Sequence, residues 1–452
     1  MAPTRHPAEK ADPSPLGQPL KFEASGKTAK NRFLKASMTE RLCSWDPKDF
    51  DKRGIPSKEL INVYRRWGEG GYGVILTGNL MIEPDQLEAP GNLIVPRGAP
   101  FSGERFEAFK EMASAAKKHG SLVLAQVSHP GRQVPDRIQP HPISASDVKL
   151  DKVLLGLQFA KPRPMEKADF DNVIEGFAHA ADYLQKAGYD GVELHAAHGY
   201  LLAQFLSPTT NQRTDQYGGS VLNRARIILE IKNAIRERVK DPSFIVGIKV
   251  NSVEFQSGGF TPEDCKILCA ELEKNEFDFV ELSGGTYQEF GFKHKRDSTR
   301  KREAFFLEFA DLVIPELKRT KAYVTGGLRT AQGMVKALDT VQGVGLARPT
   351  CNEFDFGQKI LDGKIDSAIV TLLDEENFGL TTIAAGTQMR AVGRNKEPID
   401  LSNEEHKKVF DQSMKKWTEG ITDNADGSKY GYVDIEGMKL EPYGTPYTAA
   451  SA

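Results

Sequence analysis

The chain has few cysteines, and their spacing excludes several kinds of metal protein. Only four occur among 452 residues, Cys43, Cys265, Cys269 and Cys351, and none forms a C-x-x-C pair. The spacing therefore indicates neither a zinc ribbon nor an iron-sulfur cluster, and it favours a reducing compartment. Cys265 and Cys269 lie four residues apart in an expected helix, where packing accounts for them.

Long apolar runs and an excess of charge are also missing. No run of about 18 consecutive apolar residues occurs, and the first 25 residues contain no apolar run of signal-peptide length. The formal net charge is −2, the pI is about 6.5 and the mean hydropathy is −0.44. Nucleic-acid binding usually needs a strongly basic surface. We therefore expect a cytoplasmic protein that acts on a small molecule, with no nucleic-acid or membrane partner.

What the chain does contain is an alternation of short strands and helices. Runs rich in β-branched and aliphatic residues predict eight strands, which begin at Arg32, Gly73, Ser121, Asp190, Phe244, Phe277, Ala322 and Val341. Helical patterns lie between them, such as the i, i+3, i+4, i+7 stripe from Phe170 to Ala187. Eight β/α units over about 330 residues indicate a (β/α)8 TIM barrel. A doubly wound sheet would usually carry a G-x-G-x-x-G turn after its first strand, and this chain has none there.

The pattern divides the chain into three parts. Residues 1–25 are expected to form a flexible N-terminal segment, residues 26–365 the barrel, and residues 366–452 a helical and irregular extension that packs on the barrel or at a subunit contact. Within the extension, Ser402 and Glu405 match an S-x-x-E capping box that predicts the start of a helix. The extension is too short and has too few strands to be a nucleotide-binding domain.

Candidate site residues stand where the predicted strands end. The C-terminal ends of the strands carry the active site in barrels of this class. The residues at these ends are polar or glycine in most cases: Ser37, Met38 and Thr39 after the first strand, Gly78 after the second, Gln126 in the third, His195, His198 and Tyr200 after the fourth, Lys249 in the fifth, Gly326 and Gly327 after the seventh, and Ala347 and Arg348 after the eighth. We expect all of them to surround one site.

Two groups of these residues indicate a phosphorylated planar cofactor. The glycines after strand seven let backbone N–H groups approach an anion, and Arg348 can bind it through a charge-assisted fork. Gln126 and Lys249 can bond the pyrimidine edge of a ring, and the lysine can stabilise negative charge on its reduced form. These features describe FMN. The alternatives are a tight turn with a surface arginine, an ion pair at Lys249 and an ordinary amide at Gln126.

The histidines of strand four indicate where a substrate binds. His195 and His198 can donate to one carbonyl oxygen and so polarise a neighbouring double bond, while Tyr200 is placed to deliver a proton. A metal site is the less favoured hypothesis, because no H-E-x-x-H helix and no carboxylate or third histidine lies beside the pair. In a third interpretation the two histidines only brace the following loop.

The segment from His195 to Arg226, HAAHGYLLAQFLSPTTNQRTDQYGGSVLNRAR, resembles the strand-four signature of the Old Yellow Enzyme family of FMN-dependent ene-reductases. The resemblance covers roughly Leu20 to Phe354. It implies isoalloxazine contacts for Thr39, Gly78, Gln126 and Lys249, phosphate contacts for Gly327, Ala347 and Arg348, substrate binding by His195 and His198, and proton donation by Tyr200. The chain departs from many members in having Lys249 where they have arginine, and from one branch in having Thr39 where that branch has cysteine.

The family mechanism implies a ping-pong cycle, in which NADH or NADPH reduces FMN and the flavin then passes hydride to the β-carbon of an α,β-unsaturated carbonyl compound. Two alternatives stay open. The barrel and FMN can serve a different redox or isomerisation reaction of specialised metabolism, or the barrel can bind flavin without catalysis. The sequence does not determine whether the protein is a homo-oligomer.

Overall fold

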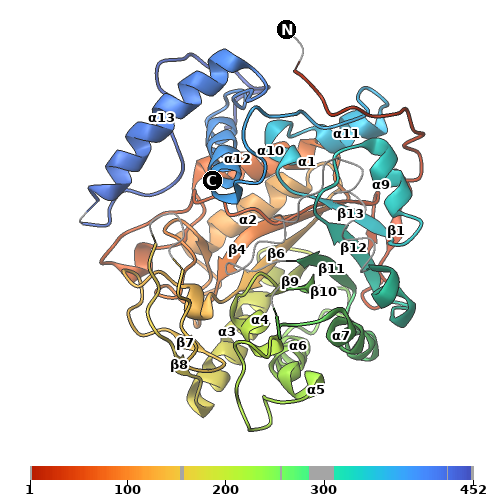
Figure 1. The fold of residues 1–452 in the computed structure, drawn as a ribbon, viewed down its shortest axis with the longest axis vertical. Coiled ribbons are helices and arrows are strands. Elements are labelled where there is room, and N and C mark those ends of the chain that lie inside the picture. The colour runs from red at the N-terminus through yellow and green to blue at the C-terminus, as the bar shows by residue number, and fades with distance from the viewer. Residues whose placement is uncertain (1–2, 153–156, 255–256, 285–309, 425, 449–452) are drawn as a thin grey trace.

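Eight parallel strands form a closed barrel at the centre of the molecule (Figure 1). The computed structural model describes residues 3–152, 157–254, 257–284, 310–424 and 426–448. In their order around the barrel the strands are β3 (Phe33–Lys35), β4 (Val74–Met81), β6 (Leu122–Ser128), β9 (Gly191–Ala196), β10 (Ile245–Val253), β11 (Phe279–Gly284), β12 (Lys321–Thr325) and β13 (Gly343–Leu346). The barrel closes because β3 pairs with both β13 and β4. The predicted fold and all eight predicted strands are confirmed.

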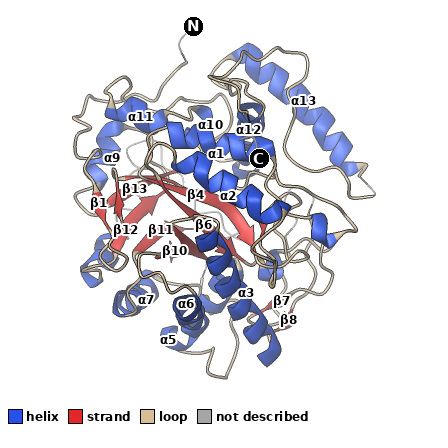
Figure 2. Ribbon diagram, turned by 180° about the vertical axis from the view of Figure 1, so that it is seen from behind, coloured by secondary structure: helices blue, strands red, loops and turns tan. Residues whose placement is uncertain are grey.

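Helices alternate with the strands and cover the outside of the barrel (Figure 2). They are α1 (Lys58–Glu69), α2 (Glu104–Lys117), α3 (Lys167–Lys186), α4 (Leu201–Leu206), α5 (Val221–Arg224), α6 (Arg226–Arg238), α7 (Pro262–Lys274), α9 (Ala331–Ala337), α10 (Pro349–Asn352) and α11 (Phe356–Leu361). Capping residues in the sequence determine where several of these helices begin. Ser220 Oγ accepts from the backbone N–H of Asn223 at α5, and Thr261 and Asp264 form a capping box at α7, with Pro262 in its first turn.

The barrel interior is apolar at one end and polar at the other. Side chains near the strand starts, including Leu34, Val74 and Phe279, form a buried cluster inside the barrel. A short hairpin made of β1 (Leu20–Lys21) and β2 (Thr28–Ala29) adds Phe22 to this cluster, with its ring 5.8 Å from that of Phe279. The N-terminal end of the barrel is therefore filled, and only the opposite end is available to a ligand.

Short strands and 3-10 turns lie in the connections between the barrel strands and the helices. They are β5 (Leu93–Ile94), β7 (Ile143–Ser144), β8 (Arg163–Pro164) and the 3-10 turns η1 (Phe50–Lys52), η2 (Gly131–Gln133) and η3 (Ile314–Glu316). The N-terminal segment also makes contacts, because Arg5 pairs with Glu353 at 2.6 Å and donates to the carbonyl of Ser367. The division of the chain at residues 25 and 365 stays a prediction.

The described part of the C-terminal extension contains two helices, α12 (Phe378–Gly393) and α13 (Glu404–Thr422). The helix predicted to start near Ser402 is confirmed as α13, but its predicted capping box is wrong. Asn403 is the N-cap, and its Oδ1 accepts from the N–H groups of Glu405 and His406, whereas the Ser402 hydroxyl donates to Asp400. Asparagine caps a helix as well as serine does, so the S-x-x-E pattern misplaced the start by one residue.

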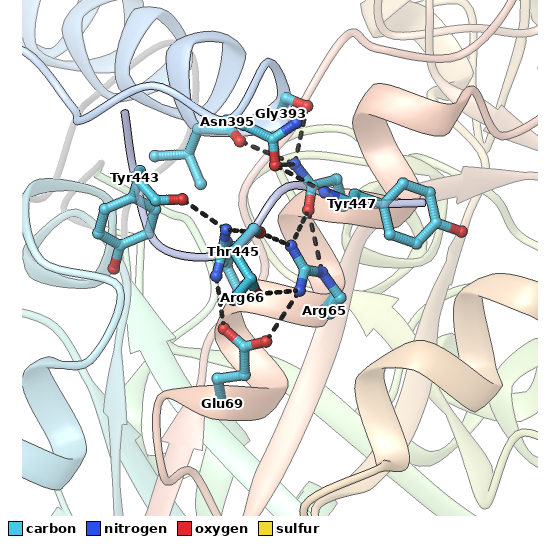
Figure 3. Close-up of polar contacts among 10 residues, drawn as sticks. Arg65, Arg66, Glu69, Gly393, Asn395, Tyr443, Thr445 and Tyr447 are labelled. Atoms are coloured by element: carbon cyan, nitrogen blue, oxygen red, sulfur yellow. Dashed lines mark hydrogen bonds and ion pairs between the residues drawn. The ribbon is translucent and has the colours of Figure 1, made fainter. Parts of the chain in front are cut away.

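The last described residues of the chain lie along α1 (Figure 3). Arg66 donates to the carbonyl oxygens of Tyr443 and Thr445, and Arg65 donates to the Thr445 carbonyl at 2.8 Å. Asn62, one turn earlier on α1, donates to the last carbonyls of α12, including that of Gly393 at 2.9 Å. These bonds fasten both α12 and the tail to the same helix of the barrel wall. None of the described helices is long and apolar enough to span a membrane.

Candidate active site

Four polar side chains point into the barrel at the layer beneath its C-terminal end. They come from neighbouring strands in register, with Gln126 beside Glu193 and Lys249 beside Glu281. Gln126 Nε2 donates to Glu193 Oε2 at 2.6 Å, and Lys249 Nζ donates to Glu281 Oε1 at 2.9 Å. All four are buried. The structure thus brings the predicted residues Gln126 and Lys249 together around two carboxyl groups.

The two carboxyl groups share one negative charge. Burial, and then the Glu281 carboxylate, raises the pKa of Glu193 well above its usual value. Burial opposes ionisation of Glu281 too, but the Lys249 ammonium and the hydrogen bonds from Glu193, Lys249 and Thr325 hold its pKa below the usual value. Glu193 is therefore neutral and Glu281 ionised, so that Lys249 has one buried counter-ion.

The histidine pair lies one layer further out, at the end of β9. His195 Nε2 is 3.3 Å from His198 Nδ1, and the two rings are nearly perpendicular. His195 Nδ1 is 2.7 Å from Asn79 Oδ1, and His198 Nε2 is 3.0 Å from Ser283 Oγ. Burial, and then the nearby positive groups, lowers the pKa of His195 well below its usual value and that of His198 to about 3. Both rings are neutral, and each carries a single proton.

The backbone at His198 is held in a conformation that few non-glycine residues adopt. Its φ angle is +58°, and Gly199 follows with a φ angle of +77°. The N–H of His198 donates to Asn251 Oδ1, and its carbonyl accepts from Gln133 Nε2. These contacts turn the chain sharply after β9, so that the His198 ring returns toward His195.

Tyr200 stands at the N-cap position of α4, with its ring 4.5 Å from that of His195. Only 4% of its surface is exposed. The three residues predicted from strand four therefore do gather at one place. No three His, Cys, Asp or Glu side chains come together as metal ligands anywhere in the part of the chain that the structure describes.

The loop after β3 packs against the end of β4. The Ser37 hydroxyl donates to the Thr77 carbonyl, and the Thr39 hydroxyl donates to the Glu88 carboxylate, whose oxygens are 2.8 and 3.0 Å away. A Cβ atom at Gly78 would lie 2.4 Å from the carbonyl oxygen of Met38. Glycine is therefore required at 78, because any side chain would push this loop away from the barrel end.

The N–H of Gly78 is already engaged. It donates to Glu40 Oε1 at 2.9 Å, and the same carboxyl group accepts from the hydroxyl of Tyr64 on α1. Burial raises the pKa of Glu40, while Lys35, Tyr64 and the Gly78 N–H oppose that rise. The N–H of Gly78 is therefore not available to a ligand.

The predicted phosphate residues lie where β12 and β13 end side by side. Gly326 and Gly327 have φ angles of +132° and +75°, which favour glycine. Arg348 is the N-cap residue of α10 and donates to Thr381 Oγ1 of α12 at 2.7 Å, and Ala347 is half-buried beside it. A cavity of about 40 Å³ lies between this arginine and α12.

These features fit FMN. Buried amide and ammonium donors at Gln126 and Lys249 suit the pyrimidine edge, whereas the two positive-φ glycines and Arg348 suit a phosphate. A further donor is Asn251 Nδ2, which is buried without a hydrogen-bond partner among the described residues.

Sequence reasoning missed the acidic groups that support the site. Glu193 and Glu281 stand in the apolar runs of strands four and six, but Glu193 lies two residues before the predicted site residue His195, on the same face of its strand, and Glu281 lies two before Ser283 in the same way. That alternation was the available signal. Asn79 stands at the predicted end of strand two, whereas Glu88 carried no signal, because only the folded loop brings it back to Asn79.

The chain matches known proteins along most of its length. The model of the NADH:flavin oxidoreductase / NADH oxidase family matches residues 15–364. A protein of Aspergillus parasiticus called NADH-dependent flavin oxidoreductase nadA is 53% identical over 408 residues, which cover 90% of this chain and 92% of that protein.

Solved structures show the same fold at lower identity. An Old Yellow Enzyme homologue from Zymomonas mobilis matches with a TM-score of 0.62 and 20% identity, covering 81% of this chain and 98% of that chain. A 2-naphthoyl-CoA reductase matches with a TM-score of 0.69 and 20% identity, covering 82% of this chain. The match spans 58% of that longer reductase chain.

Proposed function

Because this chain belongs to the NADH:flavin oxidoreductase / NADH oxidase family, whose members use FMN, we propose that it reduces the activated C=C bond of α,β-unsaturated carbonyl compounds. Bound FMN would accept hydride from NADH or NADPH and give it to the β-carbon of the alkene. The resemblance to the Old Yellow Enzyme family that the strand-four segment predicted is confirmed. The alkene and the preferred nicotinamide are part of the proposal.

Residues from the ends of six strands would hold the cofactor. Gln126 and Lys249 would bond the pyrimidine edge, and the ammonium would offset negative charge on the reduced ring. Gly326, Gly327 and Arg348 would hold the phosphate. Ser37, Met38, Thr39 and Gly78 would line the ring from β3 and β4, and Ala347 would lie beside the phosphate.

His195 and His198 would hold the carbonyl oxygen of the alkene. Both are neutral and buried, so a hydrogen bond from either ring is stronger there than in water. An oxygen between their facing nitrogens, now 3.3 Å apart, would replace the bond between the two rings. Tyr200, whose ring is 4.5 Å from that of His195, would protonate the α-carbon.

The observation that carries this proposal is the position of that pair. Two neutral imidazoles and a tyrosine lie together at the open end of a barrel whose next layer holds Gln126 and Lys249. If the two histidines only braced the following loop, neither two uncharged rings nor a phenol beside them would be required.

The test separates the two half-reactions. The purified holoenzyme is reduced anaerobically with NADH or NADPH, and the bleached flavin is then mixed with cyclohexenone, a maleimide or a nitroalkene. Rapid reoxidation, with formation of the saturated product, is expected. If oxygen reoxidises the flavin but no activated alkene does, the ene-reductase proposal is wrong although the enzyme is still a flavin oxidoreductase.

A further inference from the structure

Helix α12 of the C-terminal extension contacts the arginine that would hold the cofactor phosphate. Arg348 Nη1 donates to Thr381 Oγ1 at 2.7 Å, and Thr381 lies near the start of α12. The family model matches residues 15–364, so Thr381 lies beyond the matched region. A hydrogen bond thus joins the end of the eighth barrel strand to a segment that the family pattern does not include.

The Thr381 hydroxyl is held so that it accepts from Arg348. Its proton is directed to the backbone carbonyls of Asn377 and Phe378, whose oxygens lie 3.1 and 3.2 Å from Oγ1. A guanidinium group only donates, so its contact with Thr381 uses a lone pair of the hydroxyl oxygen. Asn377 is also the N-cap of α12, and its Oδ1 accepts from the N–H of Leu380 at 3.0 Å. The capped end of the helix therefore holds the acceptor in place.

A second contact joins α12 to the other end of α10, and the two helices lie side by side (Figure 1). Gln388 Nε2, two turns after Thr381, donates to Asn352 Oδ1 at 2.7 Å and to the carbonyl of Ile399 at 3.0 Å. Arg348 is the N-cap of α10, and Asn352 is its last residue. Helix α12 therefore holds α10 at both ends.

The space around this contact suits an anion. Arg329 and Arg348 both line the small cavity between α10 and α12, and Glu375 is the one acidic residue among the lining residues that the structure describes. The cavity lining is therefore net positive. An arginine side chain loses rotamer freedom when it binds a ligand, and a fixed acceptor removes part of that cost before the ligand arrives.

We propose that Thr381 is a positioning residue for cofactor binding, which orients Arg348 toward the phosphate of FMN. The C-terminal extension is then part of the FMN site. The inference rests on the proposed function in one respect, namely that Arg348 holds the phosphate. A guanidinium group has five N–H donors, so a bond to Thr381 is compatible with a bidentate bond to a phosphate. Thr381 acts through Arg348 and needs no contact with the cofactor.

The test compares FMN with riboflavin, which has the same ring system and no phosphate. The variant T381V keeps the shape of the side chain and removes the acceptor. Fluorescence of the released cofactor measures FMN binding to the holoenzyme, and riboflavin is titrated into the flavin-free protein. T381V is expected to raise the Kd of FMN about 5-fold to 20-fold and to leave the Kd of riboflavin unchanged. T381S restores the hydroxyl and should bind FMN within about 2-fold of the unaltered protein.

A double-mutant cycle tests whether Thr381 acts through Arg348. The variant R348A/T381V is expected to bind FMN as weakly as R348A alone, because no guanidinium is left to orient. The matched control is T387V on the same helix. Thr387 Oγ1 also donates to a carbonyl of its own helix, that of Ile383 at 2.9 Å, so T387V removes a similar buried hydroxyl. It is expected to bind FMN as tightly as the unaltered protein.

Three results would overturn the proposal, because each would mean that α12 only supports the fold. They are equal weakening of FMN and riboflavin in T381V, an additive loss in R348A/T381V, and the same loss in T387V as in T381V. If T381V does not fold, T381A takes its place with the same expectations.

The variant R348A separates this inference from the proposed function. If R348A weakens FMN binding and T381V does not, only the role of Thr381 is wrong. If R348A binds FMN normally, the proposed phosphate contact and the role of Thr381 are both wrong. These measurements use neither nicotinamide nor alkene, so failure of alkene reduction would reject the proposed reaction and leave the result for Thr381 standing.

Discussion

Replacing Lys249 with methionine is expected to destabilise the barrel strongly. The variant leaves the Glu281 carboxylate inside the barrel without its cation, in a position with no measurable exposure. Removing one partner of a buried ion pair costs about 3–5 kcal/mol, because the remaining charge has lost its compensation. We expect a loss of that size in the free energy of unfolding at pH 8.

The loss of unfolding free energy in K249M depends on pH, and the structure determines whether it grows or shrinks as the pH falls. In the unaltered protein the pKa of Glu281 is held below 4.5, so the pair contributes stability above about pH 4.5 and loses it as pH falls through the folded-state pKa. In K249M burial dominates, the pKa of Glu281 rises, and the group takes up a proton at higher pH. The cost of K249M should therefore be smaller at pH 5 than at pH 8.

Urea unfolding of the flavin-free protein, followed by far-UV circular dichroism, measures this cost without a contribution from cofactor binding. The double variant K249M/E281Q should recover stability to within about 1 kcal/mol, since no charge is left unpaired. E281Q alone should cost less than K249M, because Glu193 can ionise once the charge beside it is gone. A double variant as unstable as K249M would refute this reasoning.

Four other changes test the site and the tail. R348A should weaken FMN binding about 10-fold to 100-fold, measured by fluorescence of the released cofactor, while riboflavin, which has no phosphate, binds unchanged. Y200F should keep flavin reduction by NADH but slow alkene reduction about 10²-fold or more in stopped-flow assays. G78A should lose about 1–3 kcal/mol of stability in urea, because its Cβ would lie 2.2 Å from Glu40 Oε2. R66A should make the C-terminal tail sensitive to limited proteolysis, with unchanged cleavage counting against the contacts in Figure 3.

The barrel could be predicted because the sequence patterns that indicate its strands are local and recur along the chain. Each strand is a short apolar run with turn residues at its ends, and the interior cluster around Leu34 and Phe279 follows from alternation along the strands. Once the strands are parallel, their C-terminal ends must meet at one rim. That is why Gln126, Lys249 and His195 could be placed in one site without any contact being known.

Contacts across the barrel and between loops were not predictable. The pairing of Lys249 with Glu281 depends on the register of β10 and β11, which a single strand does not reveal. Glu88 lies between Pro84 and Pro90 in a segment typical of a surface loop, and it contacts Asn79 only because the loop returns to the end of β4. The N-cap error at Ser402 has a smaller cause, since two adjacent residues both suit a cap.

The acidic side chains of this site set the charge and hydrogen bonding of neighbouring residues, and they have no direct part in the proposed reaction. Glu281 sets the charge balance of Lys249, and the neutral Glu193 beside it holds Gln126. Glu88 accepts from Asn79 Nδ2, and Asn79 Oδ1 contacts His195 Nδ1 at 2.7 Å. Glu281 therefore lies in the layer of the proposed ring contacts, and Glu88 lies next to the proposed substrate histidines. Thr39 contacts Glu88, and the Thr39 carbonyl accepts from Tyr432, so a continuous set of contacts links the extension to the histidine pair.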